Sequence, residues 1–246
     1  MKFFLFVISI LLSVYSVAGQ KVKILASSSW TAAYVYAAGI DDVDILAPVD
    51  MIHPSEYELN LNDFKRINDA DFIVYGGYEV AFKELMKNNS VNKNKFIKIN
   101  TGYNLETIKA SVNLIASKTN TLNAARANLD SIASAFSSAR KLIEDHNLNG
   151  KPVICHFFQK DFITETGMIP VYIFGPSPLE AYQIKEIADK NAVLIADNLH
   201  NPIADPIAEI KKNIRKVDLI NFPGTNKTRS LIDVINFNIN QIIGVK

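Results

Sequence analysis

Cysteine is nearly absent from this chain: Cys155 is the only one in 246 residues. A single thiol excludes an internal disulfide framework. Excess positive charge is also missing, because the formal net charge is +1 and no Lys/Arg stripe occurs, so nucleic acid is not an expected partner. Neither HExxH nor a nucleophile elbow is present, which argues against common hydrolase classes. The 48% apolar and 21% charged residues instead describe an ordinary globular protein with a real core.

The first nineteen residues predict an export signal. Residues 1–19 carry Lys2, then an apolar run, then small residues, which is the pattern of a secretory signal peptide cleaved after Ala18 or Gly19. A membrane anchor is the alternative, but the apolar run is short for a span of ~20 residues. No cysteine stands at the cleavage point, so lipid attachment is not expected. We therefore expect a free periplasmic protein and not a lipoprotein.

Glycine and proline are both missing between residues 105 and 146, where apolar residues recur at helical spacing. A polar interruption at Lys118–Thr121 divides the stretch into two helices. The second would run for roughly 26 residues, about 39 Å, which is long enough to join two lobes as a rigid strut. We thus divide the mature chain into an N-terminal lobe (20–104), a bridging helical segment (105–148) and a C-terminal lobe (149–246).

Strands alternate with helices on both sides of this segment. Such alternation predicts parallel sheets covered by helices on both faces. The expected fold is α/β, with two doubly wound parallel-sheet lobes bridged by a long α-helix. The predicted strands are Lys21–Ala26, Val43–Ala47, Phe72–Tyr75 and Lys95–Ile99 in the first lobe, and Val153–Phe157, Val171–Phe174, Val193–Ala196 and Leu219–Phe222 in the second.

Polar side chains that can bind metal gather at the ends of these strands. His53 and Glu79 do so in the first lobe, and His156, Asp197 and His200 in the second. The carboxyl ends of parallel strands share one edge of a sheet, so a cleft between the lobes would bring these groups together. Histidines with carboxylates suit a divalent metal such as Zn²⁺ or, with more oxygen, Mn²⁺.

Each of these residues also has a simpler interpretation when it is taken alone. A histidine at a strand end is more often hydrogen-bonded within the protein than bound to metal, and Asp197 could cap the helix that follows it. Cys155 is expected to be a buried structural residue. His146 ends the long helix, where a cation suits the helix dipole, and we interpret it as structural. The metal hypothesis therefore depends on the recurrence of such groups at equivalent strand ends.

Several segments together resemble a known family. These are His53–Glu79, His156–Phe162, Gly175–Glu180, Val193–Asn198 and Leu231–Asn238. In this order they are similar to the signature segments of the zinc/manganese solute-binding proteins of ABC transporters, the helical-backbone metal receptors of cluster A-I. The similarity spans the mature chain. It implies a helix-bridged, two-lobed fold that holds a metal ion between its lobes and delivers it to a membrane permease.

The resemblance also implies roles for individual residues. His53 and His156 match the first two metal ligands of the family, Asp197 falls where many members have a ligand glutamate, and His200 lies close enough to substitute. The chain departs from the family pattern in three places. Leu61–Asp63 stands where Pro-Ser-Asp is usual, and the His-rich loop of many zinc-specific members is missing. Asn221 lies in the last predicted strand, where the family often has a ligand aspartate. The fourth ligand therefore stays open between Asn221, Glu79, His200 and water.

The hypothesis from the sequence is a monomeric periplasmic binding protein, not an enzyme. It would bind Zn²⁺, or alternatively Mn²⁺, through His53, His156, Asp197 and His200, and pass the ion to an ABC-type metal permease in the inner membrane. Glu79 and Gln159 would hydrogen-bond the histidines and fix their orientation. Two alternatives are a secreted metal-dependent hydrolase and a receptor for a chelated metal or small organic ligand. A roomy apolar cleft without a histidine cluster would favour the last.

Overall fold

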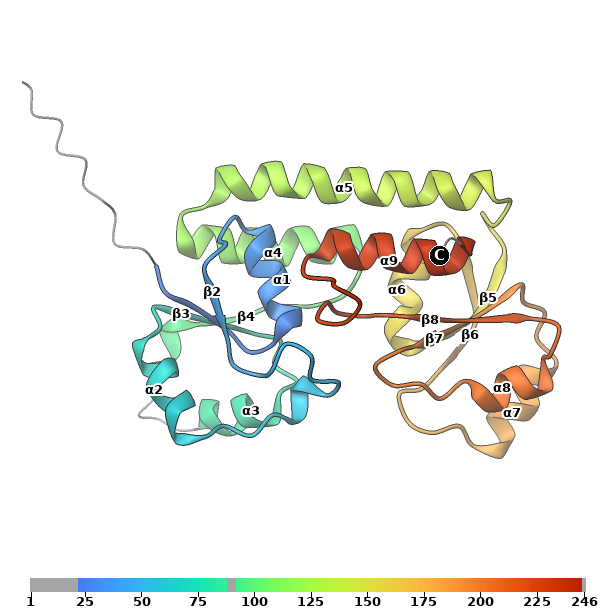
Figure 1. Cartoon of the computed structure of the whole chain (residues 1–246), viewed down its shortest axis with the longest axis horizontal. Coiled ribbons are helices and arrows are strands. Elements are labelled where there is room, and N and C mark those ends of the chain that lie inside the picture. Colours follow the sequence, from blue (N-terminus) through green and yellow to red (C-terminus); the bar gives the residue numbers. More distant parts are fainter. Residues whose placement is uncertain (1–21, 88–91, 245–246) are drawn as a thin grey trace, which may run out of the picture.

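The computed structural model describes residues 22–87 and 92–244; the predicted signal peptide lies outside these residues. Two α/β lobes lie side by side, and one long helix runs across both (Figure 1). Each lobe contains a four-stranded sheet in which all neighbouring strands are parallel. This confirms the predicted fold class. No helix in the described ranges is long and apolar enough to cross a membrane.

The N-terminal lobe has the strand order β2-β1-β3-β4. A small apolar cluster that includes Leu25, Ile73 and Phe82 packs one face of the sheet against α2 and α3, while α1 and α4 cover the other face. The elements are β1 (Ile24–Ala26), α1 (Ser29–Ala37), β2 (Val43–Ile45), the short 3₁₀ helix η1 (Pro54–Glu56), α2 (Leu61–Asp69), β3 (Phe72–Tyr75), α3 (Val80–Lys87), η2 (Lys93–Lys95) and β4 (Phe96–Lys98).

The C-terminal lobe has the strand order β6-β5-β7-β8. A cluster that includes Ile154, Ile195 and Ile207 packs one face of its sheet against α7 and α8. The other face packs toward α5, α6 and α9. The elements are β5 (Pro152–His156), η3 (Phe157–Gln159), α6 (Lys160–Glu165), β6 (Ile169–Phe174), α7 (Ala181–Ala188), β7 (Leu194–Asn198), α8 (Asp205–Ile210), β8 (Arg215–Leu219) and α9 (Leu231–Ile243).

One predicted strand was misplaced. The prediction put the last strand at Leu219–Phe222, whereas β8 spans Arg215–Leu219 and the chain leaves the sheet immediately afterwards. β8 lies at the edge of its sheet, where charged side chains reach solvent and protect the exposed edge from pairing with another chain. Because β8 is rich in charged residues, its sequence does not have the apolar pattern by which the other strands were predicted. The apolar run after it, which was predicted as the strand, forms a buried loop.

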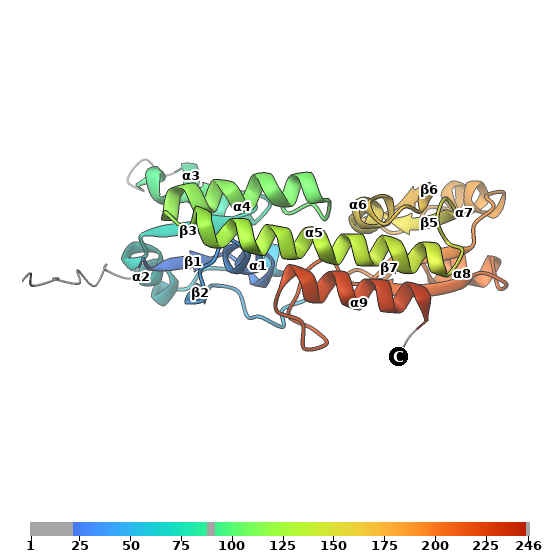
Figure 2. The same ribbon diagram turned by 90° about the horizontal axis from the view of Figure 1, so that it is seen from above.

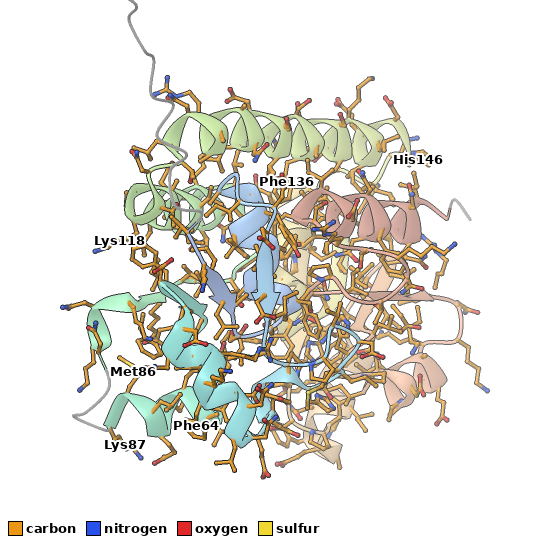
Figure 3. All side chains as sticks on the ribbon, turned by 60° about the vertical axis from the view of Figure 1, so that its left-hand side comes forward. Phe64, Met86, Lys87, Lys118, Phe136 and His146 are labelled. Atoms are coloured by element: carbon orange, nitrogen blue, oxygen red, sulfur yellow. The ribbon has the colours of Figure 1, made fainter. Side chains whose placement is uncertain are left out.

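Two helices lie between the lobes in the sequence, and only the second spans both. Helix α4 (Leu105–Thr119) packs on α1 in the N-terminal lobe, while α5 (Leu122–Asp145) runs over both lobes beside α4 and α9 (Figure 2). The 24 residues of α5 match the predicted strut, roughly 36 Å at 1.5 Å per residue. Phe136 points inward from its middle and His146 lies at its end (Figure 3).

The two lobes share a hydrophobic core. One continuous cluster of buried side chains contains Val74 and Ile97 of the first sheet, Val153 and Leu219 of the second, and Phe136 of α5 between them. Because rotation of one lobe against the other would expose part of this cluster, we expect only small movements between them.

Loops that follow the strands also join the lobes. The Ser29 hydroxyl donates a hydrogen bond to the Pro223 carbonyl over 2.7 Å. Next to it, Gly224 has φ +126° and lies so close to the first lobe that an added Cβ would meet the Val49 carbonyl oxygen at 2.1 Å. A glycine is therefore required at this contact. The two lobes touch both at α5 and at these loops.

Candidate metal centre

A cavity of about 770 Å³ lies between the lobes at the carboxyl ends of their strands. Parallel sheets hold ligands at this edge because the loops that follow the strands converge there. Every strand of both sheets contributes at least one wall residue shortly after its end or at its last position. In the N-terminal lobe, β1 to β4 contribute, in the order of the sequence, Trp30, His53, Tyr78 and Thr101. In the C-terminal lobe, β5 to β8 contribute Phe158, Pro176, Asn198 with His200, and Asn221 with Phe222.

The N-terminal lobe presents His53 to this cavity. His53 is exposed and precedes η1 in the loop between β2 and α2. The far end of the loop is fixed, because the Tyr57 hydroxyl donates to Asp63 Oδ2 over 2.8 Å. Arg66 then ties α2 to β2 through Asp44, with Nε–Oδ2 at 2.9 Å and Nη2–Oδ1 at 2.5 Å. These contacts limit where the loop can hold His53.

The C-terminal lobe presents His200, which is only 4% exposed. Its Nδ1 lies 2.8 Å from Asn221 Oδ1, and the ring stacks on Phe222 with centroids 3.7 Å apart. Since the amide oxygen can only accept, Nδ1 carries the proton and Nε2 keeps its lone pair. Nε2 is buried and has no hydrogen-bond partner among the described residues. This is the state of an imidazole prepared to bind a metal ion.

Burial also keeps His200 neutral. It lowers the pKa of His200, the hydrogen bond to Asn221 acts in the opposite direction, and the charge of His53 lowers the pKa further. A metal ion binds the neutral ring, so the lowered pKa favours binding. His53 and His200 come from different lobes and line the same cavity.

His156 lies behind the cavity wall, where it packs on the wall residue Phe158, and does not line the cavity as predicted. It is fully buried and is not among the described wall residues of the cavity. Its Nδ1 accepts the Phe158 backbone N–H over 3.1 Å, and its ring packs against Phe158 and edge-on against Phe174. The proton therefore sits on Nε2, which lies next to Gly175 and, like Nε2 of His200, is buried without a hydrogen-bond partner among the described residues. Burial lowers the pKa of His156 to about 4. In this arrangement neither nitrogen offers a lone pair to the cavity.

The Asp197 carboxylate is occupied by the backbone. It accepts N–H groups from Asn198 at 2.9 Å, Ile203 at 3.1 Å and Ala204 at 2.9 Å, and lies 3.6 Å from Lys216 Nζ. Burial raises the pKa of Asp197, while these hydrogen bonds and Lys216 lower it. Asp197 thus holds the chain at the start of α8, which corresponds to its simpler interpretation, and we leave it out of the proposed ligand set.

The two residues expected to orient histidines have other partners. Glu79 accepts hydrogen bonds from the Ser27 hydroxyl at 2.5 Å and from the backbone N–H groups of Gly76 and Gly77 at 2.9 and 2.8 Å. It thereby ties the end of β3 to the end of β1. Gln159 donates from Nε2 to Asn198 Oδ1 over 3.2 Å and so orients a cavity residue that is not a histidine.

Sequence reasoning overlooked most of the cavity wall. Asn221 was considered only as a ligand, whereas here it orients His200. Trp30 and Phe222 stack across the gap between the lobes with centroids 5.4 Å apart, and nothing in their local sequence indicates that contact. Across residues 22–87 and 92–244, no group of three or more His, Cys, Asp and Glu side chains could hold a metal ion. Two histidines, His53 and His200, one from each lobe, line the cavity between the lobes.

The structure is thus a two-lobed α/β protein with a cavity between its lobes at the carboxyl ends of the strands. No model of a known protein family and no curated protein matches the chain. Solved structures do match it. The laminin-binding protein Lmb of Streptococcus agalactiae, described as an adhesin with metal-transporting activity, is 16% identical, with 92% of this chain and 100% of that chain covered and a TM-score of 0.69.

Two further structures agree with this match. The solute-binding protein FpvC of Pseudomonas aeruginosa, in complex with Ni²⁺, is 15% identical with a TM-score of 0.71, covering 92% of this chain and 97% of that one. A periplasmic metal-binding protein of Candidatus Liberibacter asiaticus is also 15% identical, with coverages of 92% and 99% and a TM-score of 0.70. The chain therefore has the fold of the metal-binding solute-binding proteins.

Proposed function

We propose that this protein is the periplasmic solute-binding component of a metal importer. It binds a divalent transition metal between its lobes and delivers the ion to an ABC-type permease in the inner membrane. Residues 1–19 would direct its export and be cleaved, and the mature protein would act as a monomer. It would bind its ligand without chemical turnover, which distinguishes it from the alternative of a secreted metal-dependent hydrolase.

The observation that carries this proposal is the pair of histidines in the cavity between the lobes. His53 and His200 come from different lobes, and the Nε2 lone pair of His200 is free because Asn221 holds the proton on Nδ1. Imidazole nitrogen suits Zn²⁺, whereas Mn²⁺ favours carboxylate oxygen. Because Asp197 and Glu79 are both occupied by backbone N–H groups, we propose Zn²⁺ as the cargo and Mn²⁺ as the alternative.

Calorimetric titration of the purified protein with Zn²⁺ and with Mn²⁺ at pH 7.5 tests the proposal. We expect Zn²⁺ to bind, and His53→Ala and His200→Ala each to weaken binding at least tenfold. His146→Ala is the matched control, because His146 is exposed at the end of α5 and should leave the affinity unchanged. Absence of binding by the wild-type protein, or an affinity unchanged from wild type in both cavity variants, would show that the proposal is wrong.

A further inference from the structure

The cavity between the lobes is much larger than a bare metal ion requires. Its volume of about 770 Å³ corresponds to roughly 25 water molecules at ≈ 30 Å³ each. Sites for small organic molecules typically measure about 300–1,000 Å³. An ion with four donor atoms fills only a small part of such a space. The size of the cavity therefore indicates that more than the ion enters it.

Aromatic rings form a continuous row along the cavity wall. Tyr78 lies 5.5 Å from Trp30, Trp30 lies 5.4 Å from Phe222, and Phe222 lies 3.7 Å from His200, measured between ring centroids. Trp30 and Phe222 are nearly parallel, at 28°, and Phe222 and His200 more so, at 11°. The row crosses from the N-terminal lobe to the C-terminal lobe and ends at a proposed metal ligand. A flat ring bound to the metal could stack on it.

The protein supplies too few donor atoms to surround the ion. His53 and His200 provide two nitrogens, while zinc in proteins usually has four ligands. The carboxylates of Asp197 and Glu79 accept backbone N–H groups instead, and the part of the chain that the structure describes has no cluster of three metal-binding side chains. Two coordination positions are thus left for donor atoms that come with the ion.

Three buried donor groups of wall residues lack a hydrogen-bond partner among the described residues. The Tyr103 hydroxyl and the Asn198 amide nitrogen are buried and have no hydrogen-bond partner among the described residues, and the same holds for the Trp30 indole nitrogen. Gln159 fixes the orientation of Asn198 by donating to its Oδ1, so Nδ2 is the free end. An unpaired buried donor costs about 1–3 kcal/mol. Three such donors favour a ligand that carries oxygen acceptors.

We propose that the cargo is a metal chelate: a divalent metal ion held by a small planar aromatic chelator with nitrogen and carboxylate oxygen donors. His53 and His200 complete the coordination of the ion, the ring of the chelator stacks on the aromatic row, and its oxygens accept hydrogen bonds from Tyr103 and Asn198. The inference rests on the proposed metal-binding function and specifies the form in which the metal arrives.

The test compares Zn²⁺ alone with Zn²⁺ mixed 1:1 with pyridine-2-carboxylate, a planar chelator with one nitrogen and one carboxylate donor. Glycine replaces it in a control, because glycine supplies the same donor types without a ring. Affinities are measured by calorimetry in a non-coordinating buffer at pH 7.5. Trp30 is the only tryptophan in the chain, so intrinsic fluorescence reports directly on stacking at the row. We expect the pyridine-2-carboxylate complex to bind at least tenfold tighter than Zn²⁺ alone and to quench this fluorescence.

Variants identify the source of the gain. Trp30→Leu should reduce the ratio between chelate and bare-ion affinities to about one, while Trp30→Phe, which keeps a ring, retains most of it. Tyr103→Phe removes only the hydroxyl and should lower the ratio about fivefold. Tyr182→Phe is the matched control, since Tyr182 is 60% exposed and lies outside the cavity wall.

The outcomes separate this inference from the function on which it rests. If Zn²⁺ alone binds through His53 and His200 and the chelator adds nothing or competes, the inference is wrong and the proposed function stands. If the chelator binds equally well without metal, the cargo is organic and the inference is also wrong. If neither Zn²⁺ nor its complex binds, the proposed function itself fails.

Discussion

Substitution of Asp197 by alanine should destabilise the protein and leave its metal affinity intact. The carboxylate accepts N–H groups from Asn198, Ile203 and Ala204, of which Asn198 and Ala204 are 1% and 0% exposed. Two fully buried donors would lose their acceptor, at about 1–3 kcal/mol each. Burial of the charged carboxylate is itself unfavourable and raises the pKa of Asp197, so its removal offsets part of this loss. We expect the free energy of unfolding to fall by about 2–4 kcal/mol.

Urea unfolding followed by circular dichroism measures this change, and calorimetry on the folded variant measures Zn²⁺ affinity. Asp197→Asn keeps one oxygen acceptor and should lose about half as much stability. Asp205→Ala is the matched control, because Asp205 also pairs with Lys216, at 2.8 Å, but its side chain is 82% exposed. That variant should unfold at the same urea concentration as the wild type, since exposed ion pairs contribute little.

The opposite pattern would refute this reasoning. If Asp197→Ala unfolds like the wild-type protein but binds Zn²⁺ more than tenfold more weakly, the carboxylate is a metal ligand. In that case the backbone contacts at the start of α8 are secondary, and the role inferred from sequence resemblance is correct.

Three further variants test other parts of the structure. Asn221→Leu should weaken Zn²⁺ binding about 10–100-fold in calorimetry because nothing then holds the proton on His200 Nδ1, while Asn221→Asp, which keeps the acceptor, should not. His156 has a pKa of about 4 when folded and near ~6.5 when unfolded, so the unfolded state binds more protons between these values. Stability measured by urea unfolding should therefore fall by about 3 kcal/mol as the pH drops from 6.5 to 4, and less so in His156→Gln. Phe136→Ala should cost about 3–5 kcal/mol and leave a single unfolding transition, because both lobes share that core, with exposed Ser137→Ala as the control.

The sequence predicts most elements because the fold depends on local patterns. Parallel strands are short apolar runs, and the long helix follows from the absence of glycine and proline between residues 105 and 146. β8 was missed because an edge strand carries charges that imitate a loop. Local pattern therefore predicts the interior of the sheets better than their edges.

The candidate site was predicted only in part, for a reason of side-chain direction. Side chains alternate between the two faces of a strand. His156 follows Ile154 by two positions and Asp197 follows Ile195 by two, so both point to the face covered by α7 and α8. Both faces of a parallel sheet are apolar, and the sequence pattern therefore does not distinguish them. His200 lies beyond the end of its strand, where it is free to reach the cavity.

The two sheets repeat one plan. In each lobe the second strand in the sequence lies at an edge, followed by the first, the third and the fourth. A duplicated ancestral lobe would produce this shared strand order. The histidines do not follow this shared plan, since His53 follows the second strand of its lobe and His200 the third of its own. Each half of the site can therefore diverge independently, so one lobe could acquire a new ligand preference without a matching change in the other.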